Sequence, residues 1–328
     1  MLHSQGQNGL DMLTGKALIE EKGPSLIESP DANAVSNYEY FSGPYLFVSF
    51  DLVDSTSYKS QNLNWPKVFN SFMISCYDNL QKCISRLNKE IVVHEWKRLG
   101  DEILFYIEHP SPESLHIIPT DVFDALQFII AGLKSSKIDR VGQLSAKATL
   151  WSAVVSSNNK TKGKNLFNIV TVEDTPYGKR LDFLGPDIDT GFRIAKYASP
   201  GKLTIDAYLA WYITKLGKKH DSNIENNMRI VSLENIKGVW NNRRYPIIWY
   251  NDKWKDEDDI FLYDEEYSSD IVKRIKENGI ESLQKTKALD KILDEVNLLA
   301  YAKQLEKSIN QYTEKHVTIK KEILLKRT

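Results

Sequence analysis

The strongest constraint on this fold is a nearly continuous apolar run, residues 45–51, that ends on the carboxylate of Asp51. A run of this length and character predicts a strand buried on both faces. A second carboxylate, Asp101, lies in a tight turn between two strand-like segments, residues 91–95 and 103–107, which predicts a β-hairpin. Two aspartates at adjacent strand ends can share one or two Mg²⁺ ions, because hard cations prefer carboxylate oxygens. The sequence therefore predicts a sheet with a metal site at the ends of its strands.

The rest of the chain alternates between strand-like and helix-like segments. Asn64 is a candidate N-cap for one amphipathic helix, and Thr120 is a candidate N-cap for another. The predicted strands are 45–51, 91–95, 103–107, 144–155, 181–184, 202–206, 229–233 and 245–250, and the predicted helices are 64–87, 120–135, 186–198 and one between 206 and 229. The order βαββαβ, followed by αβ-type elements, predicts an α+β fold that is ferredoxin-like in its centre, with helices on one face of the sheet.

Three parts are expected along the chain. Residues 1–43 are mixed in composition and are interpreted as an N-terminal arm, and residues 44–250 are expected to form the main domain. Residues 251–328 begin as an acidic and aromatic linker and continue as a helical C-terminal extension with apolar positions on one face. Two interpretations of that face stay open: it packs back on its own domain, or it mediates dimerisation or contact with a partner.

Composition excludes several classes of protein. The 328 residues carry a formal net charge of −1, so no basic field indicates binding to nucleic acid. No apolar run reaches the roughly 20 residues that span a bilayer. The N-terminus has no apolar signal-peptide segment, so we expect a cytoplasmic protein without membrane contact. Cys76 and Cys83 lie about 10 Å apart along a predicted helix, too far for a disulfide, and the sequence has neither a P-loop motif nor a Cys/His zinc cluster.

A third segment, residues 181–193, completes a pattern with the two carboxylate segments. Within it, Asp182 is followed three residues later by Gly185 and eleven residues later by Arg193. With all three segments in this order, residues 44–250 resemble the catalytic domain of the class III nucleotidyl cyclases. The resemblance implies the fold of that family and a cyclase activity on a nucleoside triphosphate.

The resemblance also implies a two-metal site. Asp51 and Asp101, together with the backbone carbonyl of Leu52, would hold two divalent cations, Mg²⁺ or Mn²⁺. Such cations lower the pKa of the ribose hydroxyl and bind the triphosphate. Ser55 and Thr56 would bind phosphate oxygens through their backbone N–H groups, because the chain enters a helix there.

A base-binding pair and a catalytic arginine are implied as well. Lys97, four residues before the second metal aspartate, and Asp182 would bind the base. Arg193 would stabilise charge at the reacting phosphate, and Lys237, before the last strand, would contact the triphosphate. In this family the two halves of each site come from different subunits, so the resemblance implies a homodimer with two shared sites.

Three residues depart from the usual family pattern. Asp189 stands where most adenylate cyclases have a catalytic Asn that contacts the transition state, and an ionised Asp cannot donate a hydrogen bond. Asp54 replaces a usual Gly, and Phe50 replaces a usually small residue beside the first metal aspartate. A bulky Phe50 at the base pocket and an altered helix at Asp189 favour a base smaller than adenine.

With these departures, the chain looks most like the pyrimidine cyclases of the bacterial Pycsar antiphage systems. That resemblance implies conversion of UTP, or next CTP, to the 3′,5′-cyclic monophosphate plus pyrophosphate, and a separate effector that binds the product. An adenylate cyclase that makes cAMP stays an alternative, because the Lys97/Asp182 pair suits adenine, cytosine and uracil alike. An inactive, cyclase-like nucleotide-binding module is the alternative of another class. A diguanylate cyclase or a polymerase palm would also use two metal carboxylates, but neither explains the spacing from Asp182 to Arg193.

Overall fold

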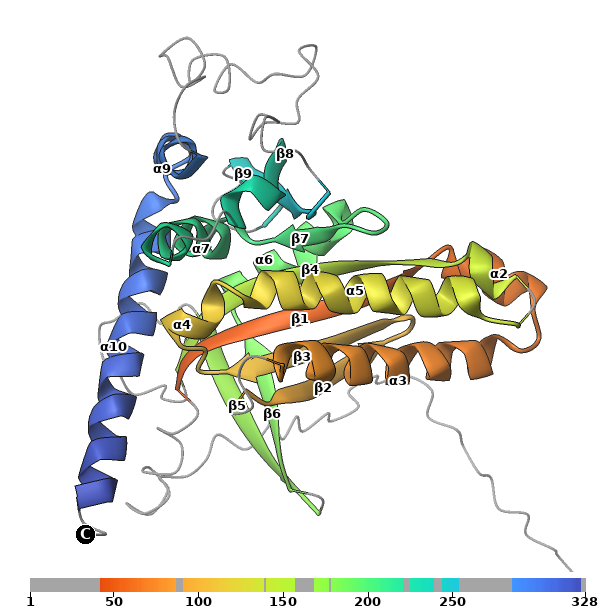
Figure 1. Ribbon diagram of the computed structural model, residues 1–328, viewed down its shortest axis with the longest axis horizontal. Coiled ribbons are helices and arrows are strands. Elements are labelled where there is room, and N and C mark those ends of the chain that lie inside the picture. Colours follow the sequence, from red (N-terminus) through yellow and green to blue (C-terminus); the bar gives the residue numbers. More distant parts are fainter. Residues whose placement is uncertain are drawn as a thin grey trace, which may run out of the picture. The chain divides into compact units, whose positions relative to one another are not determined.

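The computed structural model describes residues 42–86, 91–138, 140–156, 168–176, 178–220, 224–238, 244–253 and 285–325. Within these ranges nine strands form one mixed sheet, with the main order β2-β3-β1-β4-β7-β9-β8 (Figure 1). The strands are β1 Gly43–Val53, β2 Val93–Leu99, β3 Glu102–Glu108, β4 Ser145–Ser156, β5 Asn168–Thr175, β6 Gly178–Leu184, β7 Leu203–Ile205, β8 Met228–Asn235 and β9 Arg244–Tyr250. The helices are α2 Ser55–Gln61, α3 Trp65–Ile84, α4 Pro112–Leu115, α5 Ile118–Ser135, α6 Pro186–Ile194, α7 Ala207–Lys219, α9 Lys285–Glu295 and α10 Leu299–Leu325. The α+β class predicted from the sequence is confirmed.

Strand β1 lies in the centre of the sheet because it is apolar on both faces. It pairs antiparallel with β3 on one side and with β4 on the other. Seven consecutive residues of β1, from Pro44 to Phe50, are buried. The predicted hairpin is also confirmed, since β2 and β3 pair antiparallel around Gly100 and Asp101. These pairings bring the last residues of β1 next to the hairpin turn.

Helices α3 and α5 lie side by side on one face of the sheet (Figure 1). Their apolar stripes are buried, as the helical spacing predicted, and Cys76 and Cys83 lie in this layer as buried free thiols. The prediction that Thr120 caps the second helix is wrong, because α5 begins earlier, at Ile118. The Thr120 hydroxyl instead lies 2.8 Å from the hydroxyl of Tyr250. Asn64 does occupy the N-cap position of α3, although its side chain makes no capping hydrogen bond.

Of the hairpin formed by β5 and β6, only the second strand, β6, was predicted from the sequence. Strand β5 continues the sheet in parallel from the end of β4, and β6 returns antiparallel to it (Figure 1). The polar residues of β5 weakened its apolar signal, whereas Val170 is buried and Val172 packs against the core. Helix α6 follows β6 directly and packs against β4.

Helices α9 and α10 pack against α7, and α10 also contacts β1 (Figure 1). The apolar residues that become buried in this C-terminal part are Leu289, Ile292, Leu293, Val296, Leu298, Ala302, Leu305 and Ile309. Polar contacts join the same helices: the Tyr212 hydroxyl donates to Asn310 Oδ1 at 2.9 Å, and Lys215 Nζ lies 2.8 Å from a carboxylate oxygen of Glu306. Of the two interpretations of the apolar face, the structure therefore supports packing on its own domain.

Some expected segments lie outside the described residues. These are residues 1–41 of the N-terminal arm, the polar loop 158–164 and residues 254–284 of the linker. Among the helices of the described part of the chain, none has the length and apolar character needed to cross a bilayer.

Asp121 makes the stability of this fold dependent on pH. It lies in the first turn of α5 and is 6% exposed. Burial, and then the charge of Asp124, raises the pKa of Asp121 from 3.8 to about 7, although Arg86 opposes the shift. The folded chain thus keeps a proton that the unfolded chain loses between these two values. As the pH rises from 3.8 to about 7, deprotonation of this carboxyl therefore lowers the free energy of unfolding. Above about pH 7 the decrease is complete.

We expect Asp121→Asn to raise the free energy of unfolding at pH 8, by up to about 4 kcal/mol, and to leave it nearly unchanged at pH 4. Asn keeps the shape of the side chain without the charge. Urea denaturation at the two pH values measures the effect, with Asp294→Asn, an exposed position on α9, as the control. Equal stabilities of Asp121→Asn and wild type at pH 8 would contradict this prediction.

Candidate active site

The two predicted metal aspartates meet at the end of β1. Asp51 lies in β1, and Asp101 lies in the turn between β2 and β3. The Leu52 N–H donates to the Asp101 carbonyl at 3.4 Å, which fixes the turn against the strand. In the register of the sheet, Asp51 lies opposite Glu102, the residue after Asp101. The structure therefore brings together the pair that the sequence predicted.

Burial is the main cause that raises the pKa of Asp51 above its ordinary value. The negative charge of Asp101 raises it further, whereas Lys147 opposes the shift. Burial likewise raises the pKa of Glu102, and the charges of Asp51 and Asp101 add to that effect. The site thus concentrates negative charge in a partly desolvated place, where a cation is strongly favoured.

Lys147 is a residue of this site that the sequence reasoning missed. It lies opposite Asp51 in the register of β1 and β4, and its Nζ is 3.1 Å from Asp51 Oδ2. Its side chain is 22% exposed, so the amine can still reach solvent or a ligand. The available signal was a single charged residue in the otherwise uncharged strand 144–155.

This set of donors fits a divalent cation. Asp51 and Asp101 offer carboxylate oxygens, and the ammonium of Lys147 already lies where a positive charge is favourable. Among the described residues, no group of three or more His, Cys, Asp or Glu side chains could hold a metal ion. The remaining ligands would be a backbone oxygen, for which Leu52 stays the prediction, water, and phosphate oxygens of a substrate, as is usual for Mg²⁺.

The residues that follow β1 hold the site together. The hydroxyl of Ser55 donates to Asp101 Oδ2, and Ser55 is only 4% exposed, so its side chain holds this predicted metal ligand in place. Thr56 is exposed in the first turn of α2, and phosphate binding by its N–H and that of Ser55 stays a prediction. Asp54 precedes α2 with φ 63°, a left-handed conformation that Asp tolerates better than most residues other than Gly.

Phe50 lies on the other face of the sheet from Asp51. Adjacent residues of a strand point to opposite faces. The Phe50 ring is fully buried and packs edge-on against Phe105, which in turn faces Tyr77 of α3. The expectation that Phe50 narrows the base pocket is therefore corrected: its ring belongs to the core beneath α3.

Lys97 and Asp182 form a second group of site residues. Lys97 on β2 and Asp182 on β6 make an ion pair, with Nζ 2.7 Å from Oδ1. Both side chains are partly exposed, 27% for Lys97 and 32% for Asp182, so the pair is open to a ligand. The indole N–H of Trp96, which the sequence analysis did not single out, also donates to Asp182 Oδ1 at 3.2 Å. The structure therefore brings together the two residues expected to bind the base.

Helix α6 carries Asp189 and Arg193 four residues apart, which places both on one face of the helix. Asp189 is exposed and Arg193 is partly exposed. Gly191, between them, is buried against the indole of Trp151, and an added Cβ would overlap that ring. The close approach that Gly191 permits fixes the height of α6 above β4, and with it the position of Arg193.

Lys237 lies in an exposed turn after β8, at the far edge of the sheet from β1. Among the described residues, no hydrogen bond or ion pair joins it to the metal aspartates. Within the part of the chain that the structure covers, no hydrogen bond or ion pair joins the Lys97–Asp182 pair to Asp51 or Asp101 either. Asp51 and Asp101 thus form one group of predicted residues, Lys97 and Asp182 form a second, and Lys237 lies apart from both.

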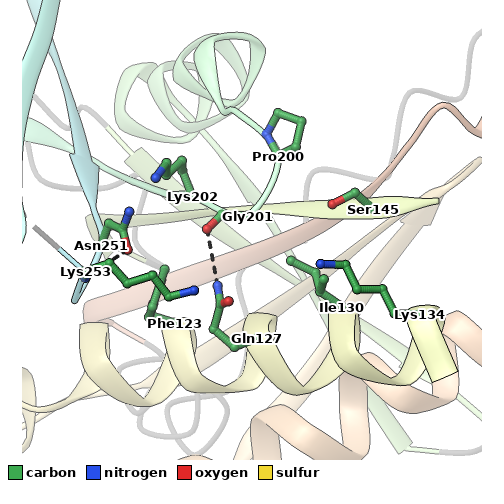
Figure 2. A pocket seen from close by; sticks show the side chains of 10 residues that line it. All are labelled: Phe123, Gln127, Ile130, Lys134, Ser145, Pro200, Gly201, Lys202, Asn251 and Lys253. Carbon is green, nitrogen blue, oxygen red and sulfur yellow. Dashed lines mark hydrogen bonds between the residues drawn. The ribbon is translucent and has the colours of Figure 1, made fainter. Parts of the chain in front are cut away.

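A basic pocket of about 260 Å³ lies between α5 and the segment Pro200–Lys202 (Figure 2). The residues that line it are Phe123, Gln127, Ile130, Lys134, Ser145, Pro200, Gly201, Lys202, Asn251 and Lys253. Across the pocket, the side-chain amide of Gln127 donates a hydrogen bond to the Gly201 carbonyl at 3.3 Å. None of the predicted site residues lines it, so this pocket is separate from the candidate active site.

Solved cyclase domains are similar to this chain in structure. The guanylate cyclase domain of RhGC from Catenaria anguillulae, solved with GTP, is 15% identical, with a TM-score of 0.44, over 64% of this chain and 97% of that domain. The adenylyl cyclase CyaB from P. aeruginosa is 12% identical, with a TM-score of 0.45, over 65% and 96% of the two chains. An adenylate/guanylate cyclase/hydrolase from Silicibacter pomeroyi is 11% identical, with a TM-score of 0.40, over 63% and 94%. No family model and no curated protein matches the chain.

Proposed function

We propose that this protein is a nucleotidyl cyclase that converts a nucleoside triphosphate into a 3′,5′-cyclic monophosphate and pyrophosphate. The observation that carries the proposal is the meeting of Asp51 and Asp101 at the end of β1, together with the Lys97–Asp182 pair that joins β2 to β6. The first pair suits divalent cations and the second suits the edge of a base. Together they provide the two binding functions that such a reaction needs.

The reaction needs the ribose 3′-oxygen to lose its proton and attack the α-phosphorus, while the bond from that phosphorus to the pyrophosphate oxygen breaks. Divalent cations bound by Asp51 and Asp101 would lower the pKa of the 3′-hydroxyl and neutralise the phosphates. Lys147, whose amine pairs with Asp51, would be free to bind a phosphate oxygen if Asp51 served as a metal ligand. Ser55 keeps the Asp101 carboxylate in place throughout.

Arg193 supplies the electrostatic part of the proposal. A guanidinium donates to two oxygens at once and stabilises charge that develops on a phosphate in the transition state. In a homodimer, Arg193, Asp189, Lys97, Asp182 and Lys237 of one subunit would complete the site that begins with the metal aspartates of the other. The separation of these groups within one chain supports this arrangement.

For the base, we propose a pyrimidine, with UTP first and CTP second. Phe50 no longer supports this choice, because its ring lies in the core. Aromatic bulk beside the base-binding pair comes instead from Trp96 and Phe192, whose rings lie 6.0 Å apart. The role in antiphage defence, and the separate effector that binds the product, rest on the Pycsar resemblance alone. An adenylate cyclase stays the second candidate, because the Lys97–Asp182 pair also matches adenine.

Incubation of the purified protein with Mn²⁺ and each of ATP, GTP, CTP and UTP, followed by mass spectrometry, tests the proposal. We expect cyclic UMP or cyclic CMP together with pyrophosphate. Cyclic AMP alone would overturn the pyrimidine assignment and leave the cyclase in place. Nucleotide binding without any cyclic product would favour an inactive, cyclase-like module.

A further inference from the structure

Strand β2 contains an irregularity beside the base-binding pair. Its pairing with β3 runs in register up to Glu95 opposite Phe105 and then resumes with Lys97 opposite Leu104. Trp96 is therefore an extra residue, a β-bulge. In a regular strand Trp96 and Lys97 would point to opposite faces, whereas a bulge can turn both to one side.

Both side chains indeed reach the same carboxylate. The Trp96 indole N–H donates to Asp182 Oδ1 at 3.2 Å, and Lys97 Nζ lies 2.7 Å from the same oxygen. The backbone N–H of Phe183 also donates to this oxygen, at 2.9 Å. Among the described residues no hydrogen bond to Asp182 Oδ2 is found. One carboxylate oxygen is thus saturated with donors, and the other is left for a ligand.

The indole itself is held firmly. Trp96 is 6% exposed, and its ring packs against Phe47 and Phe183, each with centroids 5.3 Å apart. The Lys97 amine lies 4.8 Å from the centroid of the same ring. A buried ring in such a cluster has little freedom, so the direction of its N–H is fixed before any ligand binds.

We infer that Trp96 is a specificity-determining positioning residue: through the β2 bulge it holds Asp182 by Oδ1, so that Oδ2 alone faces the base. A single acceptor beside the Lys97 ammonium matches a base edge with one donor next to one acceptor. Uracil, cytosine and adenine each have such an edge. Guanine also has one, its O6 beside its ring N–H, but the amine next to that N–H would then face Oδ1, which already has three donors. Trp96 would therefore act against guanine. This inference rests on the proposed role of Asp182 in binding the base.

The hydrogen bond can be tested without any turnover. The chain has seven tryptophans, and Trp96→Phe identifies the Trp96 indole signal in a ¹⁵N-labelled protein. We expect Asp182→Ala to move that signal upfield, because the acceptor is lost. The signal of Trp249, whose indole N–H donates to the Tyr197 carbonyl at 3.0 Å, should not move and serves as the control. A Trp96 signal that does not respond to Asp182→Ala would overturn the inference.

Selectivity is tested with 3′-deoxynucleoside triphosphates, which lack the attacking hydroxyl and bind without reacting. In Trp96→Phe we expect the preference for the best-bound nucleotide over 3′-deoxy-GTP to fall by about tenfold, whereas the matched variant Trp249→Phe keeps it. An unchanged preference in Trp96→Phe would overturn the inference. A wild-type protein that binds nucleotides but makes no cyclic product would refute the cyclase proposal alone, because the preference is still measured. A wild-type protein that binds none of the 3′-deoxy analogues of ATP, GTP, CTP and UTP would overturn both the cyclase proposal and this inference.

Discussion

Replacing either metal aspartate, as Asp51→Ala or Asp101→Ala, is expected to lower cyclase turnover by at least about 1,000-fold. Each change removes one of the two carboxylates that meet at the end of β1. Asp51→Ala also leaves Lys147 without the carboxylate it pairs with, which adds positive charge where the cation should bind. Turnover is measured as cyclic product formed at saturating Mn²⁺ with the nucleotide that the wild type prefers.

The control for this prediction is Asp78→Asn, an exposed position on α3, which should keep full activity. Circular dichroism and thermal unfolding of all variants establish that the loss is not one of folding. Asp51 and Asp101 are partly exposed at a strand end and a turn, so their removal leaves the apolar core complete. A double variant, Asp51→Ala with Asp101→Ala, that still turns over at the wild-type rate would remove the metal assignment.

Two inactive chains are expected to restore activity to each other. In the shared-site arrangement, a dimer of one Asp51→Ala chain and one Arg193→Ala chain has both defects in one site and neither in the other. After random subunit exchange, half of the dimers are mixed, and each holds one intact site of two. About a quarter of the wild-type activity should therefore return. Each single variant alone should be inactive, because both sites of its dimer carry the defect.

Mixing Asp51→Ala with Asp101→Ala is the matched control for this experiment. Both changes fall in the same half of the site, so every site of a mixed dimer has a defect and no activity should return. Exchange is followed independently, by mass spectrometry of intact dimers with one chain isotopically labelled. If exchange is complete and the Asp51→Ala and Arg193→Ala pair stays inactive, each site belongs to a single chain and the shared-site proposal fails.

Apolar periodicity predicted most of the fold. The central strand, the hairpin at Asp101 and the helices under the sheet have strong patterns, because one or both of their faces are buried. Strand β5 has only a weak apolar pattern, because Asn, Thr, Glu and Asp interrupt its apolar residues. The start of α5 was also missed, because Ile118 and Pro119 precede the hydroxyl residue that was expected to cap it.

Asp51 and Asp101 could be predicted from residue type and their places at strand ends, whereas Lys97 and Asp182 were implied by the family resemblance. The structure brings these four residues into two pairs. Lys147 and Trp96 could not be predicted, because their roles depend on strand register and on a bulge. Phe50 was misplaced for a related reason: its position in sequence is next to Asp51, yet strand geometry sends its side chain to the opposite face.

The packing of α9 and α10 changes what counts as one folding unit. Residues 44–250 carry every predicted site residue, and by sequence they look sufficient. Yet Trp211 and Tyr212 of α7 are buried, and they donate to Asp290 of α9 and Asn310 of α10. Helix α10 also reaches the beginning of β1, where Tyr312 stacks on His109 at 4.1 Å, so it braces the end of the central strand farthest from the metal aspartates. A fragment cut at residue 250 would expose the apolar side of α7 to water, so we expect it to be less stable than a chain that extends through α10.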